Sequence, residues 1–190
     1  MANPNEQAAQ SPKASKVIIA VNTPNGVGYF ADSEGRFLFR KQFEKVRSFS
    51  EGLAPVKQNG KWGYINTKGE VVVPCFYDDA KSFLRGLARV KQNGKYGYIN
   101  PQSEVVVPCI YDWVEDFSEG FTCVKQNEKW GFINTQGEVV IPFIYDEVQS
   151  FHEGLAEVKQ NGKGSIINKE GKVIVAEYGW NTSWSKVEME

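Results

Sequence analysis

A period of 34 residues runs through most of the chain and constrains its fold more than any other feature of the sequence. The segments VKQNGKWGYIN, VKQNGKYGYIN and VKQNEKWGFIN begin at Val56, Val90 and Val124. A repeat held at constant spacing is typical of stacked architectures, in which each unit packs only against its neighbours. Because a catalytic site is needed once, the motif is either a packing unit or a ligand site used several times.

The period divides the chain into five repeats between polar ends. Complete repeats occupy 49–82, 83–116 and 117–150, a degenerate first repeat occupies 16–48, and a degenerate last repeat occupies 151–176. Residues 1–15 are expected to be a disordered lead-in because they are polar, and residues 177–190 form a tail. Degenerate end units fit a stack, since each end has only one neighbour to pack against.

Within a repeat, short β-branched and aromatic runs predict strands. In 49–82 the first two strands are GLAPVKQ and KWGYIN, and Asn59-Gly60 between them suits a tight hairpin turn. The third strand, VVVP, is expected to end at Pro74, because proline brings no N–H to the ladder. The following FYDDAKSF predicts a short helical turn with Asp78 as its N-cap and Gly86 at its end.

These patterns predict an all-β protein of tandem repeats, each a three-stranded antiparallel sheet plus a short helical turn. The second and third strands are apolar on both faces, so the sheets are expected to be sandwiched between their neighbours. Two arrangements fit, an open twisted stack (solenoid-like) and a closed five-bladed propeller-like ring. The decayed end repeats favour the open stack.

The aromatic and glycine positions that recur in the complete repeats are expected to pack. An aromatic ring on each second strand would fill the space between sheets, and the glycine after it would let another backbone or ring come close. The residues assigned to packing are Trp62, Gly63, Tyr96, Gly97, Trp130, Gly131, Tyr77, Tyr111 and Tyr145. The alternative is that the rings of the second strands form a stacking platform for a ligand.

Positions that break the pattern are better candidates for partner binding. Trp113 stands where the other complete repeats carry an acidic residue, and it is expected to be an exposed interface anchor. Arg89 and Glu157 occupy one variable slot of the first strand, which is expected to face outward. Trp180 and Trp184 lie in the tail, where they either cap the last sheet or reach a partner.

Charge and hydropathy argue against two classes of partner. The chain has 22 Lys and Arg against 23 Asp and Glu, without the basic stripe of a nucleic-acid binder. The start has no apolar core of a signal peptide, and no later stretch is apolar enough to span a bilayer. The sequence therefore predicts no nucleic-acid or membrane partner and a cytoplasmic location, or secretion if a targeting segment was removed.

No catalytic, cofactor or metal site can be assembled from the sequence. The single histidine, His152, falls in a variable loop slot, and the three cysteines contain no CxxC pair. Cys75 and Cys109 fill one slot of adjacent repeats, as small buried residues would. The four lysines of the Val-Lys-Gln-Asn segments either face water or form a row that binds an anionic polymer.

The units, such as FSEGLAPVKQNGKWGYINTKGEVVVPCFYD, resemble the bacterial WG β-repeat family, named for the Trp-Gly pair seen at Trp62-Gly63 and Trp130-Gly131. The resemblance covers residues 49–175 well and 16–48 weakly. It implies a non-catalytic repeat module, often joined to other domains, and supplies no catalytic residues. The hairpin alone is also similar to choline- or cell-wall-binding repeats.

The function expected from these features is a protein–protein interaction scaffold that uses no cofactor. The alternative is a carbohydrate or cell-wall binding module that uses the repeated aromatics. An enzyme is the third and least favoured reading.

Overall fold

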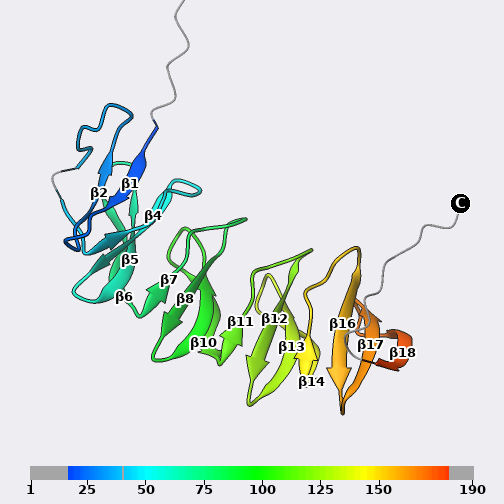
Figure 1. The fold of residues 1–190 in the computed structure, drawn as a ribbon. Helices are drawn as coiled ribbons and strands as arrows, with labels where there is room; N and C mark the ends of the chain where they lie inside the picture. Colours follow the sequence, from blue (N-terminus) through cyan, green and yellow to red (C-terminus); the bar gives the residue numbers. More distant parts are fainter. Residues whose placement is uncertain (1–16, 40, 180–190) are drawn as a thin grey trace, which may run out of the picture.

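The computed structural model describes residues 17–39 and 41–179, and this part is built from antiparallel strands without a helix (Figure 1). A two-stranded sheet pairs β1 (Ile19–Asn22) with β2 (Gly28–Ala31). Four four-stranded sheets follow. Their strands are β3 (Lys45–Val46), β4 (Leu53–Gln58), β5 (Lys61–Asn66) and β6 (Val71–Tyr77); β7 (Asp79–Ala80), β8 (Ala88–Gln92), β9 (Lys95–Ile99) and β10 (Val105–Tyr111); β11 (Trp113–Val114), β12 (Phe121–Gln126), β13 (Lys129–Asn134) and β14 (Val139–Tyr145); β15 (Glu147–Val148), β16 (Leu155–Gln160), β17 (Lys163–Asn168) and β18 (Val173–Gly179).

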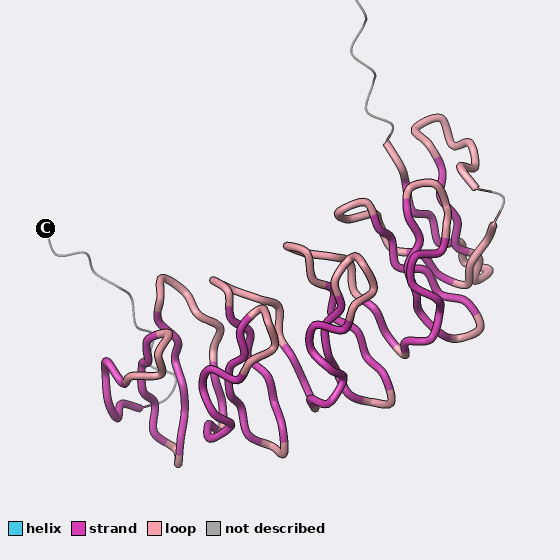
Figure 2. Tube along the Cα trace, turned by 180° about the vertical axis from the view of Figure 1, so that it is seen from behind, coloured by secondary structure: helices cyan, strands magenta, loops and turns pink. Residues whose placement is uncertain are grey.

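The sheets stack one after another in chain order and form an open arc (Figures 1 and 2). The sheet that contains β1 and the sheet that contains β18 lie at opposite ends of the row and do not meet. The prediction of tandem antiparallel sheets in an open stack is therefore confirmed, and the closed ring is wrong.

The predicted helical turn is wrong, because the segment after each Tyr-Asp pair is a short strand. Asp79 pairs with Lys91 and Ala80 pairs with Val90. This segment is therefore the short edge strand with which the next four-stranded sheet begins. A single helical turn closes few hydrogen bonds for the residues it orders, whereas the extended segment joins a ladder that already exists. Each sheet consequently begins ahead of the predicted repeat boundary, for example at Asp79 rather than at Phe83.

The glycine expected to end that helical turn belongs instead to a second hairpin turn in each repeat. Ser50 and Leu53 exchange backbone hydrogen bonds of 2.9 and 3.0 Å across Glu51-Gly52. Both central residues have positive φ, 52° and 81°, as in the turns that suit twisted hairpins. The predicted turn at Asn59-Gly60 is confirmed by φ values of 52° and 75°.

The third strand does not end at its proline. β6 continues through Pro74 to Tyr77, with a bulge where it faces Gly63 of β5. A Cβ on Gly63 would lie 2.4 Å from the carbonyl oxygen of Val73, so only glycine fits this close approach. The backbone expected to come close thus belongs to the same sheet. In the last sheet Ser165 replaces this glycine, Ala176 replaces the proline, and beyond the bulge the register of β18 differs by one residue, with Tyr178 rather than Gly179 opposite Gly164.

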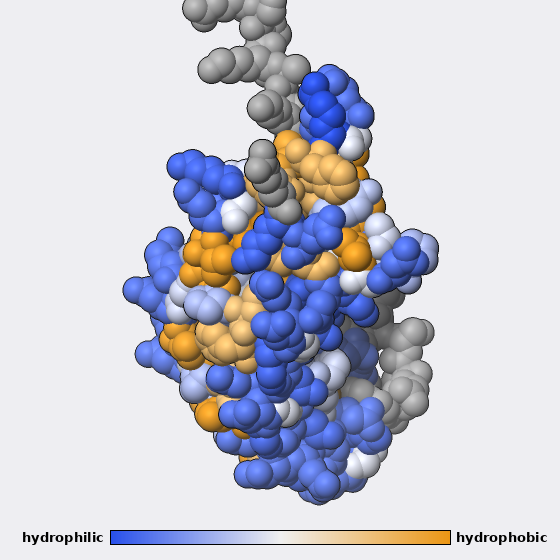
Figure 3. Space-filling view, turned by 90° about the vertical axis from the view of Figure 1, so that its left-hand side faces the viewer, coloured by the Kyte–Doolittle hydropathy of each residue, from blue (hydrophilic) through white to orange (hydrophobic). Residues whose placement is uncertain are grey.

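One edge of each four-stranded sheet is its long last strand, which carries exposed apolar side chains. Val71, Val105 and Val139 are about half exposed at the start of three such strands. Proline and the bulge blunt these edges against pairing with another chain. Seen from the end of the stack that holds β1, hydrophobic residues gather in the upper part and along one side, and hydrophilic residues cover the lower part (Figure 3).

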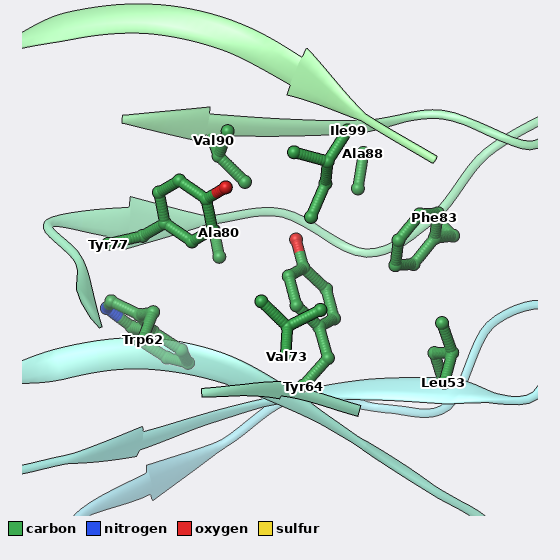
Figure 4. Packing of buried hydrophobic residues seen from close by; sticks show 10 residues of the cluster. All are labelled: Leu53, Trp62, Tyr64, Val73, Tyr77, Ala80, Phe83, Ala88, Val90 and Ile99. Carbon is green, nitrogen blue, oxygen red and sulfur yellow. The ribbon is translucent and has the colours of Figure 1, made fainter. Parts of the chain in front are cut away.

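The core consists of layers of side chains between successive sheets. In one layer Tyr64 of β5 points toward the next sheet beside Val73, and Phe83 closes one end (Figure 4). The Tyr64 hydroxyl donates to the Lys81 carbonyl at 2.6 Å, and burial raises the pKa of Tyr64 above its usual range. Tyr77, Tyr111 and Tyr145 are also buried. Each layer therefore joins two neighbouring sheets, as expected for a stack.

The aspartate of each Tyr-Asp pair binds across to the next hairpin rather than capping a helix. Asp112 accepts hydrogen bonds from Lys95 Nζ and, at 2.9 Å, from the Asn127 N–H. Asp146 makes the equivalent contacts with Lys129 Nζ and, at 2.8 Å, with the Asn161 N–H. These donors hold the pKa values of both carboxyl groups below their usual range.

The aspartate contacts predict a loss of stability in acid. A carboxyl group whose pKa is lower in the folded chain contributes its full stabilisation above its unfolded value of about 3.9 and loses it as the pH falls through the folded value. We expect urea midpoints to fall below about pH 4, and to fall less steeply when Asp78, Asp112 and Asp146 are all replaced by asparagine. The matched control is Asp116→Asn, since the Asp116 side chain is 72% exposed. Equal slopes for the triple variant and the wild type would contradict the assignment.

Candidate functional site

An open depression of about 730 Å³ surrounds Trp113. The residues that line it include Asp112, Trp113, Glu115, Lys125, Glu128 and Trp130. They come from β11, β12, β13 and the tip of the hairpin between β12 and β13. The depression therefore brings the candidate Trp113 together with one of the repeated tryptophans.

Trp113 lies on the short edge strand β11 and is 40% exposed. Its indole Nε1 donates a hydrogen bond of 2.7 Å to Glu115 Oε1. The Tyr96 ring of the preceding sheet packs edge-on against it, with 5.1 Å between ring centroids. The exposed ring is therefore held in one orientation by a hydrogen bond and a ring contact, which lowers the entropy cost of using it as an anchor.

The substitution of an acidic residue by Trp113 also removes the carboxylate that faces the equivalent lysine in the last sheet. In the next sheet the cross-strand pair is Glu147 and Lys159, joined by an ion pair of 2.8 Å. Trp113 takes the place of the glutamate opposite Lys125. Among the described residues no direct ion pair joins Lys125 to a carboxylate, but its charge helps to lower the pKa of the nearby Asp112, and its Nζ lies 5.8 Å from the centroid of the Trp130 ring. A positive charge thus lies close to the Trp130 ring and to the Asp112 carboxyl group.

Glu128 adds a strained backbone to the rim of the depression. The equivalent turns carry glycine, for example Gly60 and Gly94, whereas Glu128 adopts a φ of 67° with a side chain. A residue other than glycine in the left-handed region is unfavourable, and such positions are enriched at binding sites. In the sequence Glu128 stands out only as a replacement of a turn glycine, so its place beside Trp113 was missed.

The variable slot of the first strand faces inward, so the prediction that it faces outward is wrong. Glu157 is 5% exposed and accepts a hydrogen bond of 2.7 Å from Gln149 Nε2. Pro55 and Cys123 are also buried. Because both faces of these sheets are packed, alternation along the strand does not identify a solvent side. Burial makes Glu157 unavailable as an exposed contact residue.

Arg89 fills the same slot and lies between two sheets. Its Nη1 donates to the Val114 carbonyl at 2.7 Å, and its guanidinium carbon lies 5.8 Å from the Trp113 ring centroid. Its Nε is buried and has no hydrogen-bond partner in the described part of the chain. Arg89 therefore supports the strand that carries Trp113 and leaves one donor unused.

The repeated rings of the second strands do not form a continuous platform. Trp62 is 6% exposed, and the Arg47 guanidinium covers it at 4.2 Å from the ring centroid. Tyr96 and Trp130 are half-buried. The row of lysines is likewise in use, since Lys91 lies 4.8 Å from the Tyr96 ring centroid. A ligand could reach Trp130 but not a row of three stacked rings.

Cys75 and Cys109, expected to be small buried residues, are only partly buried and pack against the core layers. Cys123 is buried, and this burial raises the pKa of its thiol to about 11. Trp180 and Trp184 lie outside the described residues. Within residues 17–39 and 41–179 no group of three or more His, Cys, Asp or Glu side chains is placed to hold a metal ion. The same ranges contain no helix long and apolar enough to cross a membrane.

The geometry defines a β-repeat protein made of stacked sheets, with Arg89, Trp113 and Glu128 close to one junction and Glu157 in the last sheet. A family model described as "WG containing repeat" matches four consecutive segments, 30–62, 62–96, 96–130 and 130–163. The chain belongs to this family of repeat proteins. A comparison with curated proteins finds no match.

Solved structures with some likeness include two described as Hsv2 proteins. Hsv2p of Kluyveromyces lactis is 12% identical, with a TM-score of 0.47 over 80% of this chain and 58% of that chain. KlHsv2 with loop 6CD replaced by a Gly-Ser linker is 10% identical, with a TM-score of 0.48 over 87% of this chain and 67% of that chain. A protein of unknown function from Bacteroides caccae is 15% identical, with a TM-score of 0.35 over 87% of this chain and 78% of that chain. This chain thus spans 58% of the length of the first, and TM-scores below 0.5 support no transfer of function.

Proposed function

We propose that this chain is a non-catalytic binding module that docks a protein partner at the depression around Trp113. The observation that carries the proposal is the indole of Trp113, which is 40% exposed and held in one orientation. It stands at a position where the other complete repeats have an acidic residue. Tryptophan is the side chain most enriched at the energetic centres of protein interfaces. Lys125 and the strained Glu128 on the same rim fit a docking surface better than a solvated face.

The rest of the proposal concerns chemistry and location. The residues that recur are used in packing, and the single histidine lies on an exposed hairpin turn. The module therefore acts by binding alone, without a cofactor and without a nucleic-acid or membrane partner. A cytoplasmic location is likewise part of the proposal.

The test is a selection of twelve-residue peptides from a random displayed library on the wild-type protein, followed by affinity measurements on variants. Trp113→Ala is expected to weaken the selected peptides at least about tenfold, the effect of about 1.4 kcal/mol. The melting temperature should change by no more than about 2 °C, because the side chain is partly exposed. Phe76→Ala is the matched control, since Phe76 is 43% exposed on another sheet. Peptides that bind all three proteins equally would contradict the proposal.

A carbohydrate is the second candidate ligand, and the half-buried Trp130 is the observation that favours it. An indole face beside Asn127 and Lys125 could stack on a sugar ring and bond its hydroxyl groups. Titration with cellotetraose and chitotetraose while the tryptophan fluorescence is followed tests this reading. A saturable change that Trp130→Phe abolishes would favour the sugar, and the absence of any change would remove it.

A further inference from the structure

The hairpin turns Ser-Glu-Gly of successive repeats bind one another along one end of the stack. Ser50 Oγ donates to the Phe83 carbonyl at 2.6 Å, and Glu51 Oε2 accepts from the Gly86 N–H at 2.9 Å. Ser118 and Glu119 repeat both contacts one junction further on, at 2.7 Å to the Phe151 carbonyl and 3.0 Å from the Gly154 N–H. Each turn thus offers a hydroxyl and a carboxylate to the next turn.

The junction between these two lacks both contacts. Leu84 and Arg85 stand where serine and glutamate stand in the neighbouring repeats. The backbone of Arg85 keeps the same positive φ, 53°, so the turn is intact and only its side chains differ. Within the described ranges, neither the Phe117 carbonyl nor the Gly120 N–H receives the contact that its equivalents receive.

The side chains around this junction are mostly basic and apolar. A small cavity of about 30 Å³, room for about one water molecule, lies against Lys81, Arg85, Arg89 and Asp116. Leu84 is 57% exposed beside it, and Leu87 and Phe117 also line it. Arg89 brings the buried Nε that has no partner among the described residues. Lys81 already pairs with Asp79 at 3.7 Å, and Arg89 approaches Asp116 at 3.9 Å. Among the described residues the groups that lack an acceptor are therefore the Arg85 guanidinium, the buried Nε of Arg89 and the backbone N–H of the exposed Gly120.

We propose that this junction binds a carboxylate side chain from an acidic segment of a polypeptide partner. The Glu51 contact shows that a glutamate carboxylate fits the turn N–H in this row. At the Leu84–Arg85 turn Arg85 occupies the position of that glutamate, so a cation replaces the carboxylate. An incoming glutamate would bond the Gly120 N–H and pair with Arg85, and an apolar neighbour on the same segment would cover Leu84. The inference rests on the proposed function only in that the partner is a polypeptide.

The closing experiment restores the missing contacts. The double variant Leu84→Ser, Arg85→Glu gives this turn the side chains of its neighbours, so it should fill the site from within. Its melting temperature should rise by about 2–4 °C in the absence of any ligand. The probes are the fluorescein-labelled peptides (Glu-Leu-Gly)4, (Gln-Leu-Gly)4 and (Lys-Leu-Gly)4, measured by fluorescence anisotropy at constant salt.

We expect (Glu-Leu-Gly)4 to bind the wild type at least about tenfold more tightly than the glutamine peptide and to lose this preference in the double variant. Trp113→Ala should keep the preference, which separates this site from the Trp113 surface. Equal binding of the Glu and Gln peptides, or a preference that survives the double variant, would overturn the proposal. Tighter binding of oligogalacturonate than of the Glu peptide would also overturn it, in favour of an acidic polysaccharide.

Discussion

Replacing Gly97 by alanine is expected to destabilise the protein by about 3 kcal/mol, the upper end of the usual cost of overpacking. A Cβ on Gly97 would lie 2.4 Å from the Val107 carbonyl oxygen and 2.8 Å from the backbone of Pro108. Neither group can move without disrupting the bulge of β10, and β10 is the edge strand of this sheet. In a chain of this length the melting temperature should fall by about 6–12 °C.

The control separates the added Cβ from the loss of glycine as such. Gly94 has a positive φ of 79°, and a Cβ there would meet nothing within 4 Å. Gly94→Asn should therefore cost less than about 1 kcal/mol, since asparagine tolerates this conformation and Glu128 already occupies the equivalent position in the next repeat. Equal costs at Gly94 and Gly97 in thermal melts would show that the close approach does not constrain the sheet.

Phe83→Ala should cost about 3–5 kcal/mol, the usual loss for deleting a buried phenylalanine ring. Phe83 is 1% exposed, and its ring lies 5.0 Å from that of Tyr64 across the layer between two sheets. Because each sheet packs only on its neighbours, the cavity weakens the junction and both sheets that meet there.

Urea denaturation of Phe83→Ala and Phe83→Leu measures this effect. Leucine fills part of the cavity, so its cost should be less than half that of alanine. A cost below about 1 kcal/mol for Phe83→Ala would mean that the layer between these sheets contributes little to stability.

The regular part of the fold could be predicted from the sequence because the repeat compares the chain with itself. Positions that stay aromatic or glycine through the period, such as Tyr77 and Gly63, are buried or closely approached. The alternation of turns and apolar runs also identified the long strands, and the decayed ends pointed to an open stack.

Two of the wrong predictions have different physical causes. The segment after each Tyr-Asp pair has a capping aspartate and apolar residues at helical spacing, yet it is a short strand because a ladder of the next sheet is available to it. The slot of Glu157 looked exposed because its residue type varies. In a stack with both faces covered, each junction is packed by its own set of side chains, so variation reflects repacking as well as function.

The candidate site was predicted only in part. Trp113 was identified because it replaces an acidic residue, but its neighbours Lys125 and Glu128 come together only through the pairing of β11 with β12. The missing contacts at Leu84 and Arg85 could have been noticed as a break in Ser-Glu-Gly, and their meaning required the hydrogen bonds of the neighbouring turns.

The most direct test of the account is the affinity of one selected peptide for Trp113→Ala and for Trp62→Phe, measured side by side in conditions where both variants are folded. If the repeated tryptophan packs and the irregular one binds, the affinity falls at least about tenfold in Trp113→Ala and less than about twofold in Trp62→Phe. Full affinity in Trp113→Ala together with a large loss in Trp62→Phe would contradict it.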